Sequence, residues 1–495
     1  MSAWVSNQVA RLLDKACRRY ADSPAAGTLK AARTRLREPL RVAIAGKVKA
    51  GKSTLLNALV GEQLAPTDAG ECTRIVTWYR DGITYQVTLH PTSGRPVPVP
   101  FRRENGALTI RLDGHRPEAI DRMVVDWPSA SLRTMILIDT PGIGSLSTDI
   151  AGRTHAFLAP ADRPGEADAV CYLMRHLHGT DARFLESFHD DRAARGTPMN
   201  AIGVLSRADE IGVGRLDALQ TADLIARRYR ADPQVRRLCQ TVVPVAGLLA
   251  QAAVTLREDE YASLASLAAA DRSLTAELLW SADRFGADQP SLEVDCGRRR
   301  ALLDRMGLFG VRLSLALIRG GGAPSATQLA RALVDQSGIT AFKETLATQF
   351  AARADLLKAR SALLALDVVL RAHPGPGGSE LATELERILA STHEFTEART
   401  MNALRAGNVP LADDAATEAE RLLGGHGGTA TARLGLPEAS DIATIQAAAT
   451  EALARWRRRA EHPMATRAAV DAAAVVVRSC EGLLASAGQP VGDGT

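Results

Sequence analysis

The sequence predicts an α/β domain with a mostly parallel sheet, joined to an elongated bundle of α-helices. Between residues 41 and 247, short β-rich runs alternate with helical stretches, which is typical of a parallel sheet covered by helices. After residue 247 these runs stop, and helical periodicity continues nearly to the end of the chain. A length of 495 residues with 46% hydrophobic residues is sufficient for more than one buried core.

The elements are expected in the following order. Residues 2–37 have apolar side chains at helical spacing and predict a helix before the sheet. Strands are expected at residues 42–45, 75–79, 87–90, 123–125, 135–138, 169–174, 201–205 and 242–245. Prolines and the Asn105-Gly106 pair predict a β insertion over residues 90–121. The later helices are expected over residues 338–371, 379–405, 411–424, 440–461 and 465–486.

Composition excludes several classes of protein. The net charge is only +4, and the sequence has no long basic stripe, so nucleic acid is not an expected partner. The six cysteines form no C-x-x-C pair, which argues against structural zinc and for a reducing, cytoplasmic location. The first residues do not resemble a signal peptide, and the apolar runs are shorter than the ~20 residues of a membrane span. Any membrane contact is therefore expected to be peripheral.

Residues 46–53 form a complete G-x-x-x-x-G-K-S phosphate loop directly after the first apolar run. In this motif the backbone N–H groups cradle phosphates, Lys52 reaches the β and γ oxygens, and the Ser53 hydroxyl ligates Mg²⁺. The following helix adds its positive N-terminal dipole. The residues expected to contact a nucleotide here are Gly46, Lys49, Ala50, Gly51, Lys52, Ser53 and Thr54.

A second motif, D-x-x-G at residues 139–142, follows an apolar strand. Asp139 is expected to hold Mg²⁺ through water, and the Gly142 N–H to bond the γ-phosphate. Together with the phosphate loop, this motif predicts a nucleoside triphosphatase.

The polar loop over residues 66–74 lies between these two motifs. Thr73 is the candidate for a hydroxyl that closes over Mg²⁺ and the γ-phosphate, with Thr67 and Thr77 as alternatives. Thr77 already belongs to the next strand, and a loop-capping role for Thr73 stays open.

Recognition of the base is expected after the strand at residues 201–205, where Ser206-Arg207-Ala208-Asp209 stands. The Asp209 carboxylate can accept hydrogen bonds from guanine N1 and N2, and Arg207 can lie over the base. Ser206 is a weaker tether than the usual Asn or Thr, which leaves the strictness of guanine specificity open. After the last strand, the backbone at Ala246 is expected to contact guanine O6, so GTP is the expected nucleotide.

With these motifs the chain resembles the dynamin superfamily of large GTPases, in particular bacterial dynamin-like proteins of the isoniazid-inducible, IniC-type group. The resemblance covers nearly the whole chain, including its helical half. It is carried by residues 49–55, 57–61, 65–69, 73–78, 139–142, 206–212, 307–310 and 433–436.

The resemblance implies a GTPase head on a helical neck and trunk. Its implied divisions are an N-terminal neck helix (1–38), the GTPase domain (39–250), neck or connecting helices (251–336), a helical trunk (337–464), and a C-terminal neck helix with its tail (465–495). It further implies Mg²⁺-dependent hydrolysis of GTP to GDP and assembly as a homodimer through the GTPase face or with a paired dynamin-like protein. Peripheral contact with lipid at the inner face of the cell membrane, and remodelling of that membrane, are implied as well.

Two positions of the phosphate loop depart from the pattern of many dynamins, which have Gln and Ser where this chain has Val48 and Lys49. Ile143 also replaces the water-orienting Gln of small Ras-like GTPases. Lys49 is either an internal cationic finger over the β–γ bridge or a solvated cation that raises the local potential. The residues expected to take part in hydrolysis are thus Lys49, Lys52, Ser53, Thr73 and Gly142.

Other features carry weaker predictions. His176 and His178 have the spacing of metal ligands, but no carboxylate or cysteine stands beside them. The run 455–459, Arg-Trp-Arg-Arg-Arg, is typical of a membrane-surface helix or of a packed Trp with salt bridges in a bundle, and the bundle is favoured. The loops 374–378 and 424–428 are candidates for a membrane-facing tip. A nucleotide-gated scaffold is the alternative function, and an RNA-associated GTPase is disfavoured.

Overall fold

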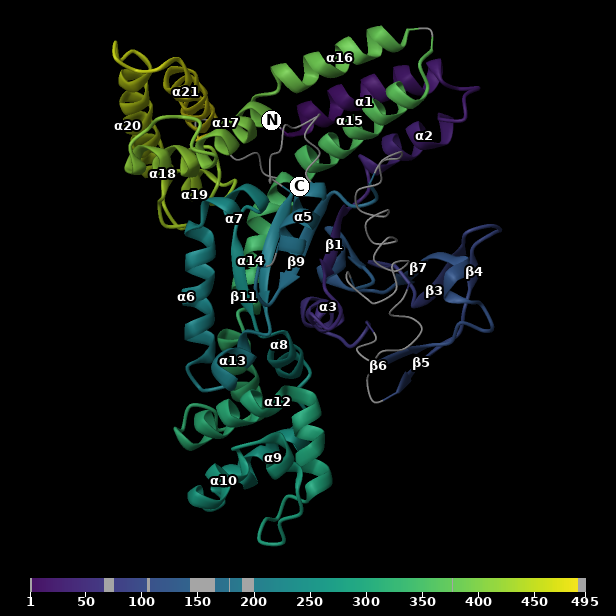
Figure 1. The fold of residues 1–495 in the computed structure, drawn as a ribbon, viewed down its shortest axis with the longest axis vertical. Helices are drawn as coiled ribbons and strands as arrows, with labels where there is room; N and C mark the ends of the chain where they lie inside the picture. The colour runs from purple at the N-terminus through teal and green to yellow at the C-terminus, as the bar shows by residue number, and fades with distance from the viewer. Residues whose placement is uncertain are drawn as a thin grey trace.

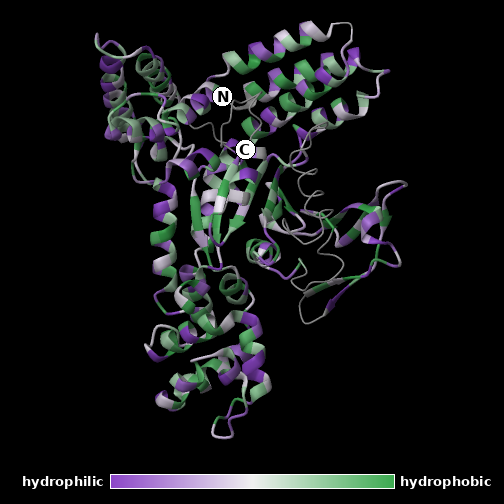
Figure 2. Ribbon diagram, in the orientation of Figure 1, coloured by the Kyte–Doolittle hydropathy of each residue, from purple (hydrophilic) through white to green (hydrophobic). Residues whose placement is uncertain are grey.

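The computed structural model describes residues 2–65, 75–104, 107–142, 165–177, 179–188, 200–375 and 377–487. A sheet forms the centre of the molecule, with helices packed around it and at both of its ends (Figure 1). Hydrophobic residues concentrate in the central strands, whereas most helices alternate between hydrophobic and hydrophilic residues (Figure 2). The arrangement is an α/β head combined with helical bundles, as the sequence predicts.

The central sheet has the strand order β11-β10-β9-β1-β8-β2-β7-β3-β4. The strands from β11 to β8 in this order pair in parallel, β2 is antiparallel to β8, and β3 is antiparallel to both β7 and β4. The bounds are β1 Leu40–Gly46, β2 Thr77–Arg80, β3 Gln86–Pro91, β4 Val97–Pro98, β7 Ile120–Asp126, β8 Met135–Asp139, β9 Ala169–Met174, β10 Ala201–Ser206 and β11 Val242–Val245. Every strand expected from the sequence is present, with small shifts at the ends.

Burial explains why these strands are recognisable. Each residue of β9 and β10 is buried, as expected for parallel strands with helices on both faces. In β1, Val42 and Ile44 face one hydrophobic core, whereas Ala43 and Ala45 face another. The sheet therefore separates two cores that lie on its opposite faces.

The β insertion places β4 at one edge of the central sheet and forms a separate two-stranded sheet. Strands β5 (Phe101–Glu104) and β6 (Ala107–Ile110) pair with Glu104 opposite Ala107, as a hairpin requires, while the Asn105-Gly106 pair lies outside the described residues. The insertion packs on Trp127, which Phe101 of β5 contacts edge-on with ring centroids 6.2 Å apart. The predicted insertion is confirmed.

Four helices pack together at the end of the sheet where β1 begins (Figure 1). They are α1 Ser2–Arg19, α2 Ala26–Arg35, α15 Ala354–Ala372 and α16 Gly378–Ser391. Two hydrogen bonds from Lys358 on α15, to the carbonyl oxygens of Leu36 (3.1 Å) and Glu38 (3.2 Å), join these helices to the chain that leads into β1. Buried Arg35 on α2 also lies 2.8 Å from Asp168 at the start of β9.

The prediction of a single helix over residues 338–371 is wrong. The segment forms α14 (Ile339–Gln349), a short 3-10 turn at Ala351–Arg353, and α15, with Phe350 at φ −109° between them. Phe350 is fully buried, and Leu346 before it and Leu357 after it are buried too, so the helical hydrophobic pattern continues on both sides of the bend. In the same way, Thr392 separates α16 from α17, where one helix was expected over residues 379–405.

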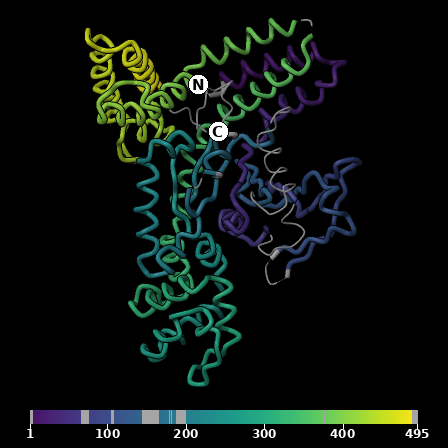
Figure 3. The backbone as a smooth tube through the Cα atoms, in the orientation of Figure 1, coloured from purple at the N-terminus to yellow at the C-terminus, as the bar shows by residue number. Residues whose placement is uncertain are grey.

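A second group of helices lies at the opposite end of the sheet, near α3 (Lys52–Val60), and α14 leads the chain back from it toward α15 (Figure 3). Its members are α8 Gly247–Val254, α9 Glu258–Ala269, α10 Arg272–Leu278, α11 Ala282–Gly286, α12 Cys296–Arg319 and α13 Ala326–Gln336. The structure thus places residues 251–336 away from α1, α15 and α16. Leu249 and Leu302 share one core, which explains this placement.

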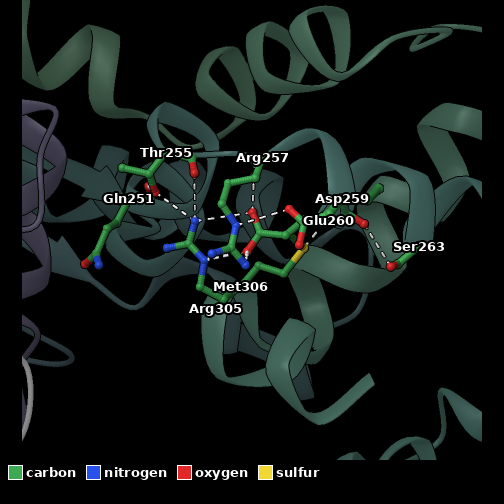
Figure 4. Close-up of polar contacts among 9 residues, drawn as sticks. Gln251, Thr255, Arg257, Asp259, Glu260, Ser263, Arg305 and Met306 are labelled. Atoms are coloured by element: carbon green, nitrogen blue, oxygen red, sulfur yellow. Dashed lines mark hydrogen bonds and ion pairs between the residues drawn. The ribbon is translucent and has the colours of Figure 1, made fainter. Parts of the chain in front are cut away.

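Polar contacts join α8, α9 and α12 within this second group (Figure 4). Arg305 on α12 donates to Glu260 on α9 at 2.8 Å and to the Thr255 carbonyl at the end of α8 at 2.9 Å. Glu260 also accepts from the Arg257 backbone N–H at 3.0 Å, which caps α9. The Arg305 guanidinium therefore joins α12 to both α8 and α9.

The C-terminal helices form a separate bundle. Its members are α17 His393–Arg405, α18 Asp413–Leu422, α19 Ala430–Leu434, α20 Ile442–Ala460 and α21 Arg467–Ala487. The last helix, α21, packs on α20, α17 and α18 around Trp456, Val476 and Cys480. Trp456 donates to Glu418 at 3.2 Å, and Arg455 pairs with the same carboxylate at 2.7 Å. This confirms the bundle interpretation of the run 455–459.

Charged residues join this bundle to the head. Arg236 on α7 (Pro233–Leu238) pairs with Glu420 of α18, which also lies 3.3 Å from Arg405 of α17. The loop 424–428 lies at this junction, where the Gly424 carbonyl accepts a hydrogen bond from Arg353. This loop is therefore not a free tip, in contrast to the prediction. The other candidate tip, 374–378, lies between α15 and α16 in the sequence, and its residue 376 is outside the described residues.

The remaining helices cover the head. They are α5 Gly179–Phe188, α6 Ala218–Ala231 and the 3-10 segments Pro117–Ala119, Ala130–Leu132 and Ala208–Val213. Within the described ranges, no helix is long and apolar enough to cross a membrane.

Candidate functional site: a phosphate loop and a base pocket

The phosphate loop connects β1 to α3 through two glycines that the geometry requires. A Cβ at Gly46 would lie 2.6 Å from the Leu173 carbonyl oxygen, closer than any real Cβ contact. Gly51 has φ +93° and precedes α3, a left-handed conformation that glycine adopts without strain. The loop therefore wraps tightly between β9 and the start of a helix, as the motif predicts.

Lys52 is directed back over this loop. Its Nζ donates to the carbonyl oxygens of Gly46 and Lys47, both at 3.4 Å. Burial lowers the pKa of Lys52, and the nearby Asp139 carboxylate opposes that shift. A cation held in this position is suited to an anionic ligand within the loop.

Ser53 and Asp139 lie together, as expected for a pair of Mg²⁺ ligands. The Ser53 hydroxyl donates to Asp139 Oδ2 at 2.7 Å. In the part of the chain that is described, Asp139 Oδ1 is buried without a hydrogen-bond partner. Burial also raises the pKa of Asp139, against the effects of Lys52 and Ser53. An unsatisfied carboxylate oxygen beside a hydroxyl fits a hard cation with oxygen ligands.

The D-x-x-G motif is held against the phosphate loop. The Thr140 hydroxyl donates to the Ile44 carbonyl of β1 at 2.9 Å. A Cβ added at Gly142 would lie 2.6 Å from Val48 Cγ2 and 2.9 Å from the Val48 nitrogen, so only glycine fits there. The two motifs are thus brought together. The candidate Thr73 and its alternative Thr67 lie outside the described residues, and Thr77 begins β2.

A pocket of about 120 Å³ adjoins the phosphate loop on the side where a base would lie. Asp209 is only 7% exposed, and burial raises the pKa of its carboxyl. The pocket is lined by Ala50, Gly51, Thr54, Leu55, Leu173, Val204, Ser206, Arg207, Asp209, Glu210, Val245, Gly247 and Leu248. Part of the expected loop set and most of the base motif therefore share one cavity, whose lining does not include Gly46, Lys49, Lys52 or Ser53.

Arg207 connects the two motifs directly. Its guanidinium donates to the Lys49 carbonyl at 2.8 Å and pairs with Glu210. Both Arg207 (φ +54°) and Lys49 (φ +61°) have left-handed backbones, which are costly for residues other than glycine. The Lys49 side chain is exposed. Ser206 donates instead to the Met174 carbonyl at 3.3 Å.

Ala246, whose backbone is expected to contact guanine O6, has a hydrogen bond elsewhere in this structure. Its N–H donates to the Ser337 carbonyl at 2.9 Å, and the residue is fully buried. Its neighbours Val245 and Gly247 line the pocket in its place.

The sequence did not reveal that Asp181 lies 3.1 Å from Lys47 of the phosphate loop. No local signal marks this contact, because the partners are far apart in the chain. His178 lies outside the described residues. No group of three or more His, Cys, Asp or Glu side chains suited to a metal ion occurs in the described segments.

Comparison with known proteins assigns the family. A sequence model of the Dynamin family matches residues 42–205, which include the phosphate loop and the D-x-x-G motif. The isoniazid-induced protein IniC of Mycobacterium tuberculosis, in two strains, is 41% identical over 451 residues, and the alignment covers 91% of each chain. The chain belongs to the dynamin family. Within that family it is an IniC-type, bacterial dynamin-like protein.

More distant members align with parts of this dynamin-family chain. The bacterial dynamin-like protein of Nostoc punctiforme is 32% identical over 158 residues, which is 28% of this chain and 23% of that protein. Dynamin-like protein A of Bacillus subtilis is 30% identical over 158 residues, which is 31% of this chain and 12% of that protein. A solved bacterial dynamin pair aligns with 98% of this chain and 74% of its own at 13% identity, with a TM-score of 0.34. The family assignment rests on the sequence relatives.

Proposed function

We propose that this dynamin-family protein is a GTPase that binds GTP with Mg²⁺ and hydrolyses it to GDP. The cycle of binding and hydrolysis changes the conformation of the protein and its assembly at the inner face of the cell membrane. Members of the family are generally GTPases, and the residues of the head fit that activity.

One observation carries the proposal: the phosphate loop and the buried Asp209 border the same pocket, and the Arg207–Lys49 hydrogen bond joins them. A carboxylate in this position accepts hydrogen bonds from guanine N1 and N2, whereas adenine offers no matching pair of donors. GTP is therefore favoured over ATP.

Ser53 and Asp139 would hold Mg²⁺, and we propose Thr73 as a further ligand. The unsatisfied Oδ1 of Asp139 supports this assignment. When bound, Mg²⁺ neutralises charge on the β- and γ-phosphates. Lys52 would supply a second positive charge from within the loop, and we propose that the Gly142 N–H bonds the γ-phosphate.

Lys49 is our candidate for an internal cationic finger. Its left-handed backbone and exposed side chain leave the ammonium free to reach toward the β–γ bridge, where negative charge develops during hydrolysis. The backbone strain that this conformation costs is of the kind found at functional positions.

Assembly and membrane contact rest on membership of the family. We propose that two heads pair through the nucleotide face, either in a homodimer or with a second dynamin-like protein. Contact with lipid is peripheral.

A second function is supported by Val48. This side chain is 48% exposed beside Gly142, and it has no polar group with which to orient water or bind a monovalent cation. A loop of this kind suits slow turnover, in which the protein acts as a nucleotide-gated scaffold for a paired dynamin-like protein.

The test measures affinity for GTP and ATP, the rate of GTP turnover, and the mass in solution with GDP and a transition-state analogue, each with and without liposomes. Preferential binding of GTP, liposome-stimulated turnover and vesicle remodelling support the first function. GTP binding with negligible turnover supports the scaffold. Binding of ATP alone, or of neither nucleotide, contradicts both.

A further inference from the structure

A buried carboxylate connects the phosphate loop to the body of the head. Lys47 Nζ lies 3.1 Å from Asp181 Oδ2, and the Tyr172 hydroxyl donates to Asp181 Oδ1 at 2.6 Å. Asp181 lies in the first turn of α5, and Tyr172 lies on β9, the strand that pairs with β1. One side chain therefore holds a loop, a helix and a strand together.

The Asp181 carboxylate is buried, so it depends on its contact with Lys47. The Asp181 side chain is 2% exposed, whereas that of Lys47 is 43% exposed. A carboxylate without water requires hydrogen bonds and a compensating charge, which Tyr172 and Lys47 supply. Tyr172 is itself fixed, because its ring stacks on Phe184 of α5 with centroids 5.0 Å apart. The anchor is thus rigid, and the residue it holds is the second residue of the phosphate loop.

The main chain of Lys47 explains how this anchor reaches the site. The Lys47 carbonyl accepts hydrogen bonds from the Ala50 N–H at 3.1 Å and from Lys52 Nζ at 3.4 Å. Any rotation of Lys47 would move the oxygen that orients Lys52 and closes the turn of the loop. The Lys47 side chain is held on the α5 side, so it acts on phosphates only through its backbone.

We infer that Asp181 is a positioning residue for the phosphate loop, acting through Lys47 to hold the loop in the shape that accepts a nucleoside triphosphate. This inference rests on the proposed binding of GTP. Tyr172 orients the carboxylate and has a smaller effect, since its loss leaves the ion pair in place.

The test compares Asp181→Asn, Lys47→Met, the double variant K47M/D181N and Tyr172→Phe with the parent. We expect each of the first two to raise the Kd of Mg–GTP about tenfold, as the loss of a hydrogen bond to a charged group does. The double variant should bind no more weakly than either single variant, because both remove the same contact. Asp223→Asn breaks a surface ion pair of α6 with Arg227 and is the matched control, with no expected change.

A second readout does not depend on nucleotide. Hydrogen exchange of the backbone over residues 46–52 should become faster in Asp181→Asn and Lys47→Met and stay unchanged in the control. Lys47→Met keeps the test decisive if Asp181→Asn does not fold, because the lysine side chain is partly in solvent.

The outcomes separate this inference from the proposed function. If the parent binds GTP but neither variant changes the Kd or the exchange, the positioning role is wrong. Lower thermal stability with an unchanged Kd and unchanged exchange would indicate a purely structural carboxylate, and additive losses in the double variant would also overturn the inference. If the parent binds no GTP, the proposed function fails, while the exchange measurement still decides whether Asp181 holds the loop.

Discussion

Replacing Asp209 by Asn tests the recognition of guanine. Asp209 is 7% exposed at the wall of the base pocket, so a hydrogen bond to its carboxylate forms largely without competition from water. Asn keeps one acceptor oxygen but turns a donor toward the guanine exocyclic amine. The loss of one hydrogen bond to a charged group and the opposition of two donors cost about 3 kcal/mol, or more than about 100-fold in affinity.

The same substitution should favour xanthine nucleotides, which have a carbonyl where guanine has that amine. Competition of GTP, XTP and ATP against a fluorescent GTP analogue measures all three affinities. Asp217→Asn makes the same chemical change on an exposed carboxylate after the base loop and serves as the control. An Asp209→Asn protein that binds GTP like the parent and gains nothing for XTP would refute the assignment of the base pocket.

Three further predictions follow from charges at defined positions. Lys49→Ala should lower turnover at least about tenfold with little change in GTP affinity. Lys49→Gly should have the same effect on turnover, and it should also stabilise the fold by about 1 kcal/mol because glycine relieves the backbone strain at φ +61°. Turnover equal to that of the parent, with and without K⁺, would contradict the role of Lys49 as a cationic finger. Because burial raises the pKa of Asp139, its carboxyl takes up a proton at a higher pH than an ordinary Asp. The Mg²⁺-dependent part of GTP affinity should therefore weaken as pH falls and recover as pH rises. Asp139→Asn should lack this pH dependence in the same titration. Glu420→Gln leaves buried Arg405 without its carboxylate and should lower the free energy of unfolding in urea by about 3 kcal/mol, whereas Glu451→Gln, at an exposed pair, should change it by less than about 0.5 kcal/mol.

Strands were predictable because each carries its own evidence. The continuous apolar runs of β9 and β10 report burial on both faces, and no partner need be known to recognise them. A helix shows the same apolar stripe whichever surface it packs on, so the stripe does not identify the packing partner. The apolar stripe of α21 fits a neck bundle as well as it fits α20, and the stripe through Phe350 does not reveal the turn between α14 and α15. Which helix covers which surface is decided by shape and by distant charges such as Arg236 and Glu420.

The candidate site, too, has parts that the sequence predicts and parts that it does not. Gly46–Ser53, Asp139 and Asp209 follow strands of a parallel sheet, so the sequence order itself predicts that they meet at one edge. The hydrogen bond from the Ala246 N–H to the Ser337 carbonyl was not predictable, because it depends on how the chain returns to the sheet after α13.

The strand β1 directly connects the two ends of the head, with no loop residues between them. Its first residue follows the segment held by Lys358, and its last is the first glycine of the phosphate loop. At about 3.3 Å per residue, its seven residues span roughly 23 Å. One residue inserted here would exchange the side chains that face the two cores and displace the loop, whereas longer connections elsewhere can absorb a residue. The length of β1 is therefore a fixed dimension of this protein, and a label on α2 or α15 should report movements that begin at the phosphate loop.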